Sequence, residues 1–147
     1  MRSLTLHATY INRTGMAQLR NLSEIRFLEL GGNDVGDVGL AHLAEMNKLV
    51  TLDLDRTGIT DDGLVHLKDL RNLESLSIAG NNITDAGIEQ LQGLPNLQRL
   101  WANRTNIGDK GARAIASLQK LTWLGISRTG VTDAGVQEIA TLPHLES

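Results

Sequence analysis

The sequence predicts an α/β solenoid, in which a curved parallel β-sheet lines a concave face and short helices cover a convex face. Three observations support this prediction. The chain repeats every 24 residues, six times, without insertion or deletion. Within each block the spacing of apolar residues changes from two to three. The fifteenth position of every block is a glycine: Gly15, Gly39, Gly63, Gly87, Gly111 and Gly135.

The 147 residues divide into one domain of six repeats and the start of a seventh. The repeats are 1–24, 25–48, 49–72, 73–96, 97–120 and 121–144, with the seventh starting at 145. The first, fourth, sixth, eleventh, sixteenth, nineteenth and twenty-second positions of each block are always Leu, Ile, Val, Met or Ala. Such a unit buries its apolar face only against its neighbours, and six units are enough for a stable core.

Each block begins with a strand. The segment Leu52-Asp53-Leu54 alternates apolar and polar residues, and a period of two is typical of a strand with one buried face. The ninth position follows the strand and is always Thr or Asn, whose side chain can satisfy the backbone groups of the turn. These residues are Thr9, Asn33, Thr57, Asn81, Thr105 and Thr129.

The second half of each block predicts a short helix or 3₁₀ segment. Thr60-Asp61 is a helix-start signal, because the hydroxyl can cap free N–H groups and the carboxylate favours the helix N-terminus. Leucines at 64, 67 and 70 then follow at intervals of three, which indicates one buried face. Gly63 within this helix costs roughly 1 kcal/mol relative to Ala. A glycine in every block therefore predicts close packing of neighbouring helical segments.

The segment Leu73-Glu-Ser-Leu76-Ser-Ile78-Ala-Gly-Asn81-Asn-Ile83 has the spacing Leu-x-x-Leu-x-Leu-x-x-Asn/Thr-x-Ile, and on this motif the chain resembles the leucine-rich repeat family. The second half of the block, such as Gly-Ala-Arg-Ala-Ile-Ala at 111–116, is similar to the ribonuclease-inhibitor-like and bacterial GALA-type subtypes. The resemblance covers the whole chain. It implies a leucine-rich-repeat solenoid whose concave face binds another protein.

Composition limits the classes of partner. The net charge of −3 gives no bulk attraction to nucleic acid or to a membrane. The chain has no Cys, which excludes thiolate metal sites and disulfide-stapled caps. No apolar run approaches the ~20 residues that span a bilayer, and no signal peptide opens the chain. We therefore predict no nucleic-acid or membrane partner and no cofactor, and the missing signal peptide and cysteines favour the cytoplasm.

The repeat phase runs from Met1 to Ser147. Solenoids normally shield their terminal repeats with polar caps, and neither end of this chain shows one. One interpretation is a piece of a longer solenoid, and another is a pair of ends that meet a second chain, which includes end-to-end self-association. The alternative is that the terminal repeats tolerate exposure.

The third, fifth and seventh positions of each block point into the concave face, and the eighth lies at its rim. Three of the four aromatic residues, Phe27, Trp101 and Trp123, fall on this face, and exposed Trp and Arg dominate binding hot spots. The register predicts Arg99 beside Trp123 and Trp101 beside Gly125. The alternative is that Arg99 only covers Trp123 by a cation–π contact. The candidate partner-binding residues are Phe27, Glu29, Asp53, Asp55, Arg56, Arg99, Trp101, Asn103, Arg104, Trp123 and Arg128.

Three of these candidates form an acidic cluster. Glu29 and Asp53 occupy the same position in adjacent strands, Asp55 faces the same way, and like charges this close repel one another. They suit a Lys or Arg of a partner, unless Arg56 neutralises them. Ca²⁺ needs several oxygen ligands from suitably shaped loops, and a flat strand surface lacks them. An Asp53/Asp55 acid–base pair, as in glycosidases, has neither enclosure nor nucleophile. We predict no metal site and no catalytic residue.

The leading hypothesis is a non-catalytic protein-interaction module that binds its partner on the concave sheet face. The alternative is a structural spacer, or a fragment of a longer repeat protein whose functional domain lies elsewhere. A third hypothesis is a carbohydrate-binding or carbohydrate-hydrolysing surface, because exposed Trp lies beside carboxylates.

Overall fold

A computed structural model describes residues 2–146; Met1, the first predicted apolar position, and Ser147 lie outside the described residues. Six strands form one parallel sheet in chain order. Adjacent strands pair in a register of one repeat, so that Leu28 lies beside Leu52 and Leu52 beside Leu76. The predicted solenoid is thereby confirmed.

Every repeat contributes one strand and one helical segment. The strands are β1 (Ser3–Thr5), β2 (Phe27–Glu29), β3 (Thr51–Asp53), β4 (Ser75–Ser77), β5 (Arg99–Trp101) and β6 (Trp123–Gly125). The α-helices are α1 (Arg13–Leu19), α2 (Gly36–Leu40), α3 (Asp61–Leu64), α4 (Asp85–Gln90), α5 (Asp109–Ala116) and α6 (Asp133–Ile139). The 3₁₀ turns η1 (Ala41–Leu43), η2 (Val65–Leu67) and η3 (Leu91–Gly93) extend α2, α3 and α4.

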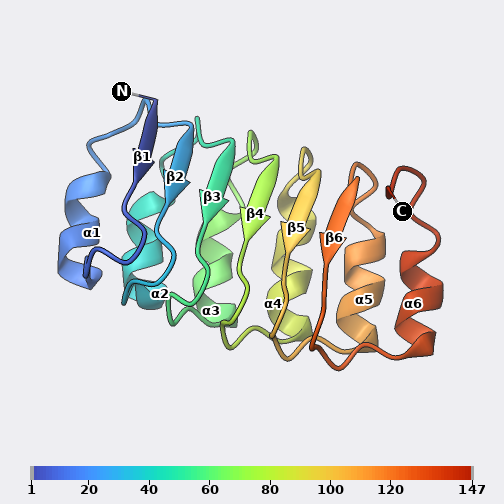
Figure 1. Ribbon diagram of the computed structural model, residues 1–147. Coiled ribbons are helices and arrows are strands. Elements are labelled where there is room, and N and C mark those ends of the chain that lie inside the picture. The colour runs from blue at the N-terminus through green and yellow to red at the C-terminus, as the bar shows by residue number, and fades with distance from the viewer. Residues whose placement is uncertain (1, 147) are drawn as a thin grey trace.

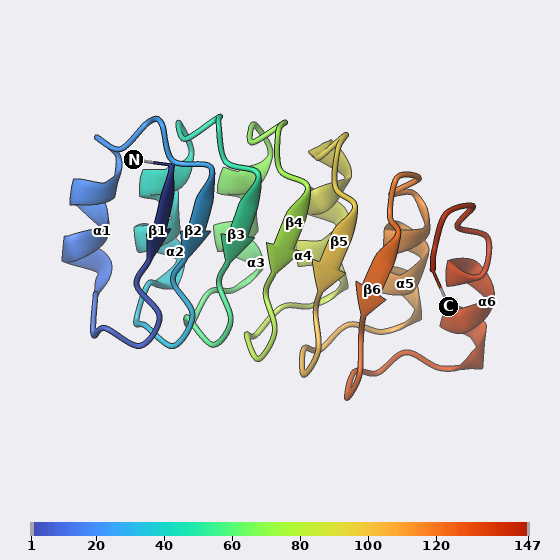
Figure 2. The same ribbon diagram turned by 45° about the horizontal axis from the view of Figure 1, so that its top comes forward.

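The molecule has two layers. The strands form one face and the helices form the other, as Figures 1 and 2 show from two directions. The row of helices spans a longer arc than the row of strands, so the sheet lines the inner, concave side. Among residues 2–146, no helix combines the length and apolar character needed to span a bilayer.

The core lies between the layers, and most of the predicted apolar positions are buried in it. The exceptions are in the first and sixth repeats. Leu4 and Leu124, on the two outer strands, are only partly buried, and Val136 of α6 is 55% exposed. Each unit is covered by its neighbours, and within residues 2–146 these repeats have a neighbour on one side only.

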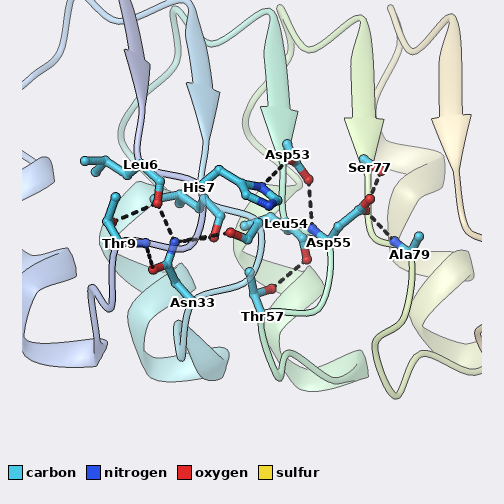
Figure 3. A network of polar contacts seen from close by, with 12 residues as sticks. Leu6, His7, Thr9, Asn33, Asp53, Leu54, Asp55, Thr57, Ser77 and Ala79 are labelled. Carbon is cyan, nitrogen blue, oxygen red and sulfur yellow. Dashed lines mark hydrogen bonds and ion pairs between the residues drawn. The ribbon is translucent and has the colours of Figure 1, made fainter.

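The ninth-position residues satisfy turn backbone, as predicted, and two of them also join repeats. Asn33 Nδ2 donates to the carbonyl oxygens of Leu30 and, in the preceding repeat, Leu6, both at 2.7 Å. The backbone N–H of Thr9 donates to Asn33 Oδ1 at 3.0 Å (Figure 3). Asn81 makes the same set of bonds to the third repeat. Buried backbone groups of two repeats therefore depend on one amide.

The Thr helix starts are capped as predicted, with Thr60 Oγ1 accepting from the backbone N–H of Asp62, and Thr84 and Thr132 acting alike. Helices α2 and α5 have no side-chain cap. The aspartate that follows the cap has a further role, which the sequence interpretation missed. Asp37 accepts the backbone N–H and the hydroxyl of Thr60 in the next repeat, both at 2.8 Å. Asp61 and Asp109 hold the caps of the fourth and sixth repeats in the same way. This aspartate column links the second repeat to the third and so on to the sixth, with Asp85 accepting the backbone N–H of Gly108 in the fifth.

Candidate functional site

The sheet presents all the candidate residues on its outer face or at its rim. In β5 the side chain of Leu100 is buried, so Arg99 and Trp101 on either side of it face outward. Beyond the strand ends, the chain turns into the helices. The candidates in strands are Phe27, Glu29, Asp53, Arg99, Trp101 and Trp123; those just beyond them are Asp55, Asn103, Arg56, Arg104 and Arg128.

Two indoles form the centre of the aromatic part of this face. The ring centroids of Trp101 and Trp123 are 4.5 Å apart, and the ring planes are tilted by 33°. Trp123 lies across Gly125 of its own strand, since a Cβ there would lie 2.8 Å from Trp123 Cη2. The space that the small Gly125 leaves beside Trp101 is therefore filled by Trp123. Trp123 remains 38% exposed, and Phe27, on β2, is 47% exposed.

Arg99 does not cover Trp123 by a cation–π contact, which was the alternative interpretation. The predicted register, Arg99 beside Trp123, is confirmed. The guanidinium instead turns the other way, and Arg99 Nε donates to Ser75 Oγ on β4 at 2.7 Å. Trp123 therefore packs against Trp101 rather than against Arg99. The small Ser75 leaves room on β4 for the Arg99 side chain.

In the acidic cluster, Glu29 ends β2, Asp53 ends β3 and Asp55 lies just beyond β3; Figure 3 shows the two aspartates. Asp53 Oδ1 accepts the backbone N–H of Asp55 at 2.8 Å. Asp55 Oδ1 accepts the hydroxyl of Ser77 and, at 2.9 Å, the backbone N–H of Ala79 in the next repeat. Sequence analysis missed His7, whose Nδ1 lies 3.9 Å from Asp53 Oδ2. The glycine at 31 was the available signal, because any side chain there would block the path of the imidazole.

The pKa of Asp53 is raised above its ordinary value of 3.8, chiefly because burial removes solvent from the carboxylate. The charges of Asp55 and Glu29 raise it further, while the Asp55 N–H and His7 act in the opposite direction. Asp109 shows the reverse: bonds from the backbone N–H and then the hydroxyl of Thr132 lower its pKa.

We expect the two carboxyl groups to titrate on opposite sides of 3.8, Asp53 above and Asp109 below. The raised pKa makes the stabilising contribution of Asp53 complete below its unfolded pKa and lost as pH rises through its folded pKa. The contribution of Asp109 is present above its unfolded pKa and lost as pH falls through its folded pKa. Side-chain carboxyl ¹³C NMR against pH measures both midpoints; the reverse order would contradict the expectation.

Three arginines occupy the eighth position of their repeats in the left-handed backbone region. Arg56, Arg104 and Arg128 have φ of 51°, 56° and 58°, where the second and fourth repeats carry Gly32 and Gly80. None of the three arginines forms an ion pair within residues 2–146, so Arg56 makes no direct contact of this kind with the acidic cluster. Arg56 lies instead over Gly80, where a Cβ would come 2.7 Å from Arg56 Cγ.

We expect Arg104→Gly to raise the free energy of unfolding by about 0.5–1 kcal/mol, because glycine removes the left-handed strain of an L-residue and this gain exceeds its added unfolded-state entropy. Arg104→Ala keeps the Cβ and should give no such gain. Urea unfolding of the two variants makes the comparison. Equal stability of the Gly and Ala variants would show that this backbone conformation carries no strain.

Across residues 2–146 no group of three or more His, Asp and Glu side chains is arranged to hold a metal ion. Asp53 and Asp55 use one oxygen each on backbone N–H groups of the sheet. The face consists of an indole pair, an acidic cluster and an arginine rim.

The repeat signature and the fold together define the class of protein. The leucine-rich repeat pattern matches residues 71–131, and a second leucine-rich repeat pattern matches residues 24–44 and 45–68. Comparison with curated proteins finds no significant match. The chain belongs to the leucine-rich repeat family.

Among solved structures, internalin C2 of Listeria monocytogenes is similar, with 31% identity and a TM-score of 0.79, over 97% of this chain and 68% of that one. Internalin F of the same organism shares the fold, with a TM-score of 0.71 and 24% identity, over 100% of this chain and 47% of that one. The chain thus spans about two thirds of the first internalin and less than half of the second.

Proposed function

We propose that this leucine-rich repeat domain is a non-catalytic protein–protein interaction module that binds another protein on its concave sheet face. The observation that carries the proposal is the Trp101–Trp123 pair, which leaves a large aromatic surface partly exposed. Indoles at the centre of a surface are typical binding anchors. The unpaired arginines at the rim and the acidic cluster then orient the partner by charge.

The proposal includes a repeat subtype and a domain division. A helical segment in every repeat supports a ribonuclease-inhibitor-like or GALA-type repeat, and the register of one repeat per strand supports a single domain of six 24-residue units. The partly exposed apolar side chains of β1, β6 and α6 support end-to-end self-association as a second contact.

The test is affinity capture from a lysate of the source cells, with the unaltered chain as bait beside Trp101→Ala/Trp123→Ala. The control is Val38→Ala/Val65→Ala, which shortens two apolar side chains that are 65% and 38% exposed on the helical face. Circular dichroism first establishes that all three fold. We expect one protein to be captured by the unaltered chain and the control and lost by the tryptophan variant. Capture by all three, or none, would favour the structural-spacer alternative.

A further inference from the structure

The fourth repeat makes a trough in the concave face. Its outward residues are all small: Ser75, Ser77, Ala79 and Gly80. Its neighbours on β3 and β5 carry larger groups at the same positions. We call this trough the β4 groove and define it by those four residues as its floor.

Two adjoining depressions follow the groove. The first, of about 300 Å³, lies over Ser75 and Ser77 between Asp53 and Trp101. The second, of about 170 Å³, lies over Ala79 and Gly80 between the two arginines of the rim and Asn103. Asp55 lines both depressions, so they adjoin one another along the strand direction.

The two ends of the groove have opposite charge. Over the strand, Asp53 and Asp55 have no Lys or Arg within ion-pair distance among residues 2–146. The nearest imidazole nitrogen of His7 is 3.9 Å from the Asp53 carboxylate. At the rim end, Arg56 and Arg104 flank Gly80 with no carboxylate paired to either in the same part of the chain. Arg56 follows Asp55 directly, just beyond the end of β3, so the acidic and basic groups lie close together.

The floor of the groove cannot pair with an added strand. β4 is already bonded to β3 on one side and to β5 on the other. A bound segment is therefore recognised by its side chains, in contrast to peptides that extend a sheet edge. The indole of Trp101 supplies an apolar wall for the aliphatic part of a long cationic side chain.

We propose that the β4 groove binds an extended segment of the partner protein that carries a Lys or Arg and, two residues away on the same face, an Asp or Glu. The cationic side chain lies against Trp101 and reaches Asp53 and Asp55. The carboxylate reaches Arg56 and Arg104. This inference rests on the proposed function, since it names the chemistry of the partner at the same face. The two carboxylates disfavour a polyanion such as a nucleic acid or a sulfated glycan.

The test uses short blocked peptides as probes: acetyl-Lys-Ala-Glu-amide against acetyl-Lys-Ala-Lys-amide and acetyl-Glu-Ala-Glu-amide. The chain has two Trp residues, so its indole N–H signals are two, and Trp123→Phe assigns them. We expect the Lys/Glu peptide to shift the Trp101 signal and to bind about tenfold more tightly than the other two at low salt.

A charge reversal at the rim sharpens the test. Arg56→Glu/Arg104→Glu keeps a Cβ at both left-handed positions and should exchange the preference, so that the Lys/Lys peptide binds about tenfold more tightly than the Lys/Glu peptide. Arg128→Glu is the matched control, because it makes the same change at the same repeat position outside the groove. Its preference should stay with the Lys/Glu peptide.

The inference is overturned if the three peptides bind equally, or if Arg128→Glu changes the preference as much as the groove variant does. Such a result leaves the proposed function intact when the tryptophan variant still loses its captured protein. Both proposals would be overturned if the three peptides bind equally and the Trp101→Ala/Trp123→Ala variant still captures the same protein as the unaltered chain.

Discussion

Gly87→Ala lowers the free energy of unfolding by about 2 kcal/mol, although alanine is the better helix former. A Cβ at this position would lie 2.2 Å from Asp61 Oδ1 and 3.0 Å from Ile83 Cγ2. The carboxylate cannot retreat without releasing the backbone N–H and hydroxyl of Thr84, which it accepts. Overpacking and loss of this link together exceed the roughly 1 kcal/mol of helix propensity gained.

The matched control is Gly93→Ala, also in a helical segment. A Cβ there would meet the carbonyl oxygen of Lys68 at 3.5 Å, an ordinary contact, so we expect unchanged or slightly higher stability. A second variant, Asp61→Ala/Gly87→Ala, removes the clashing oxygen. Urea unfolding of the single and double variants should then show positive coupling, with the alanine at 87 costing less beside Ala at 61. A full, additive cost would point to Ile83 as the source of the clash.

The same position shows how far the sequence can take the argument. A glycine in all six repeats, each at the expense of helix propensity, predicts close approach of neighbouring segments. The structure confirms it in the second to sixth repeats, whereas Gly15 lies against Ile11 of its own repeat. The identity of the approaching group was not predictable. Asp61 was interpreted as favouring its own helix, yet its oxygens bond to the next repeat, a contact that depends on the stagger between helices.

On the concave face, too, one feature was predictable from the sequence and another was not. Strand register follows from the 24-residue period, and it correctly placed Arg99 beside Trp123. Rotamers do not follow from the period. Arg99 turned to Ser75 and Trp123 to Trp101, because a small neighbour on one side decides where a long side chain lies. The side-chain contacts that define the candidate site therefore could not be predicted from the sequence, whereas the sheet that presents them could.

The stability lost by truncating a core leucine should depend on whether its repeat is central or outermost in the solenoid. We expect Leu76→Ala to lower the free energy of unfolding by about 3–4 kcal/mol, because its side chain is fully buried and the cavity cannot collapse. Leu76 lies in register between Leu52 and Leu100, so the loss weakens contacts with both neighbouring repeats. Leu124→Ala is the same change in the same column, on the outer strand β6.

Leu124 is only partly buried and has one neighbouring strand within residues 2–146, so we expect its loss to cost about 1–2 kcal/mol. Urea unfolding gives both values. The interpretation of the fold as units coupled only to their neighbours requires the central substitution to cost at least twice the outer one. Equal costs would mean that the outer repeat is covered in solution, as end-to-end self-association predicts, and dilution of the Leu124→Ala variant would then lower its stability.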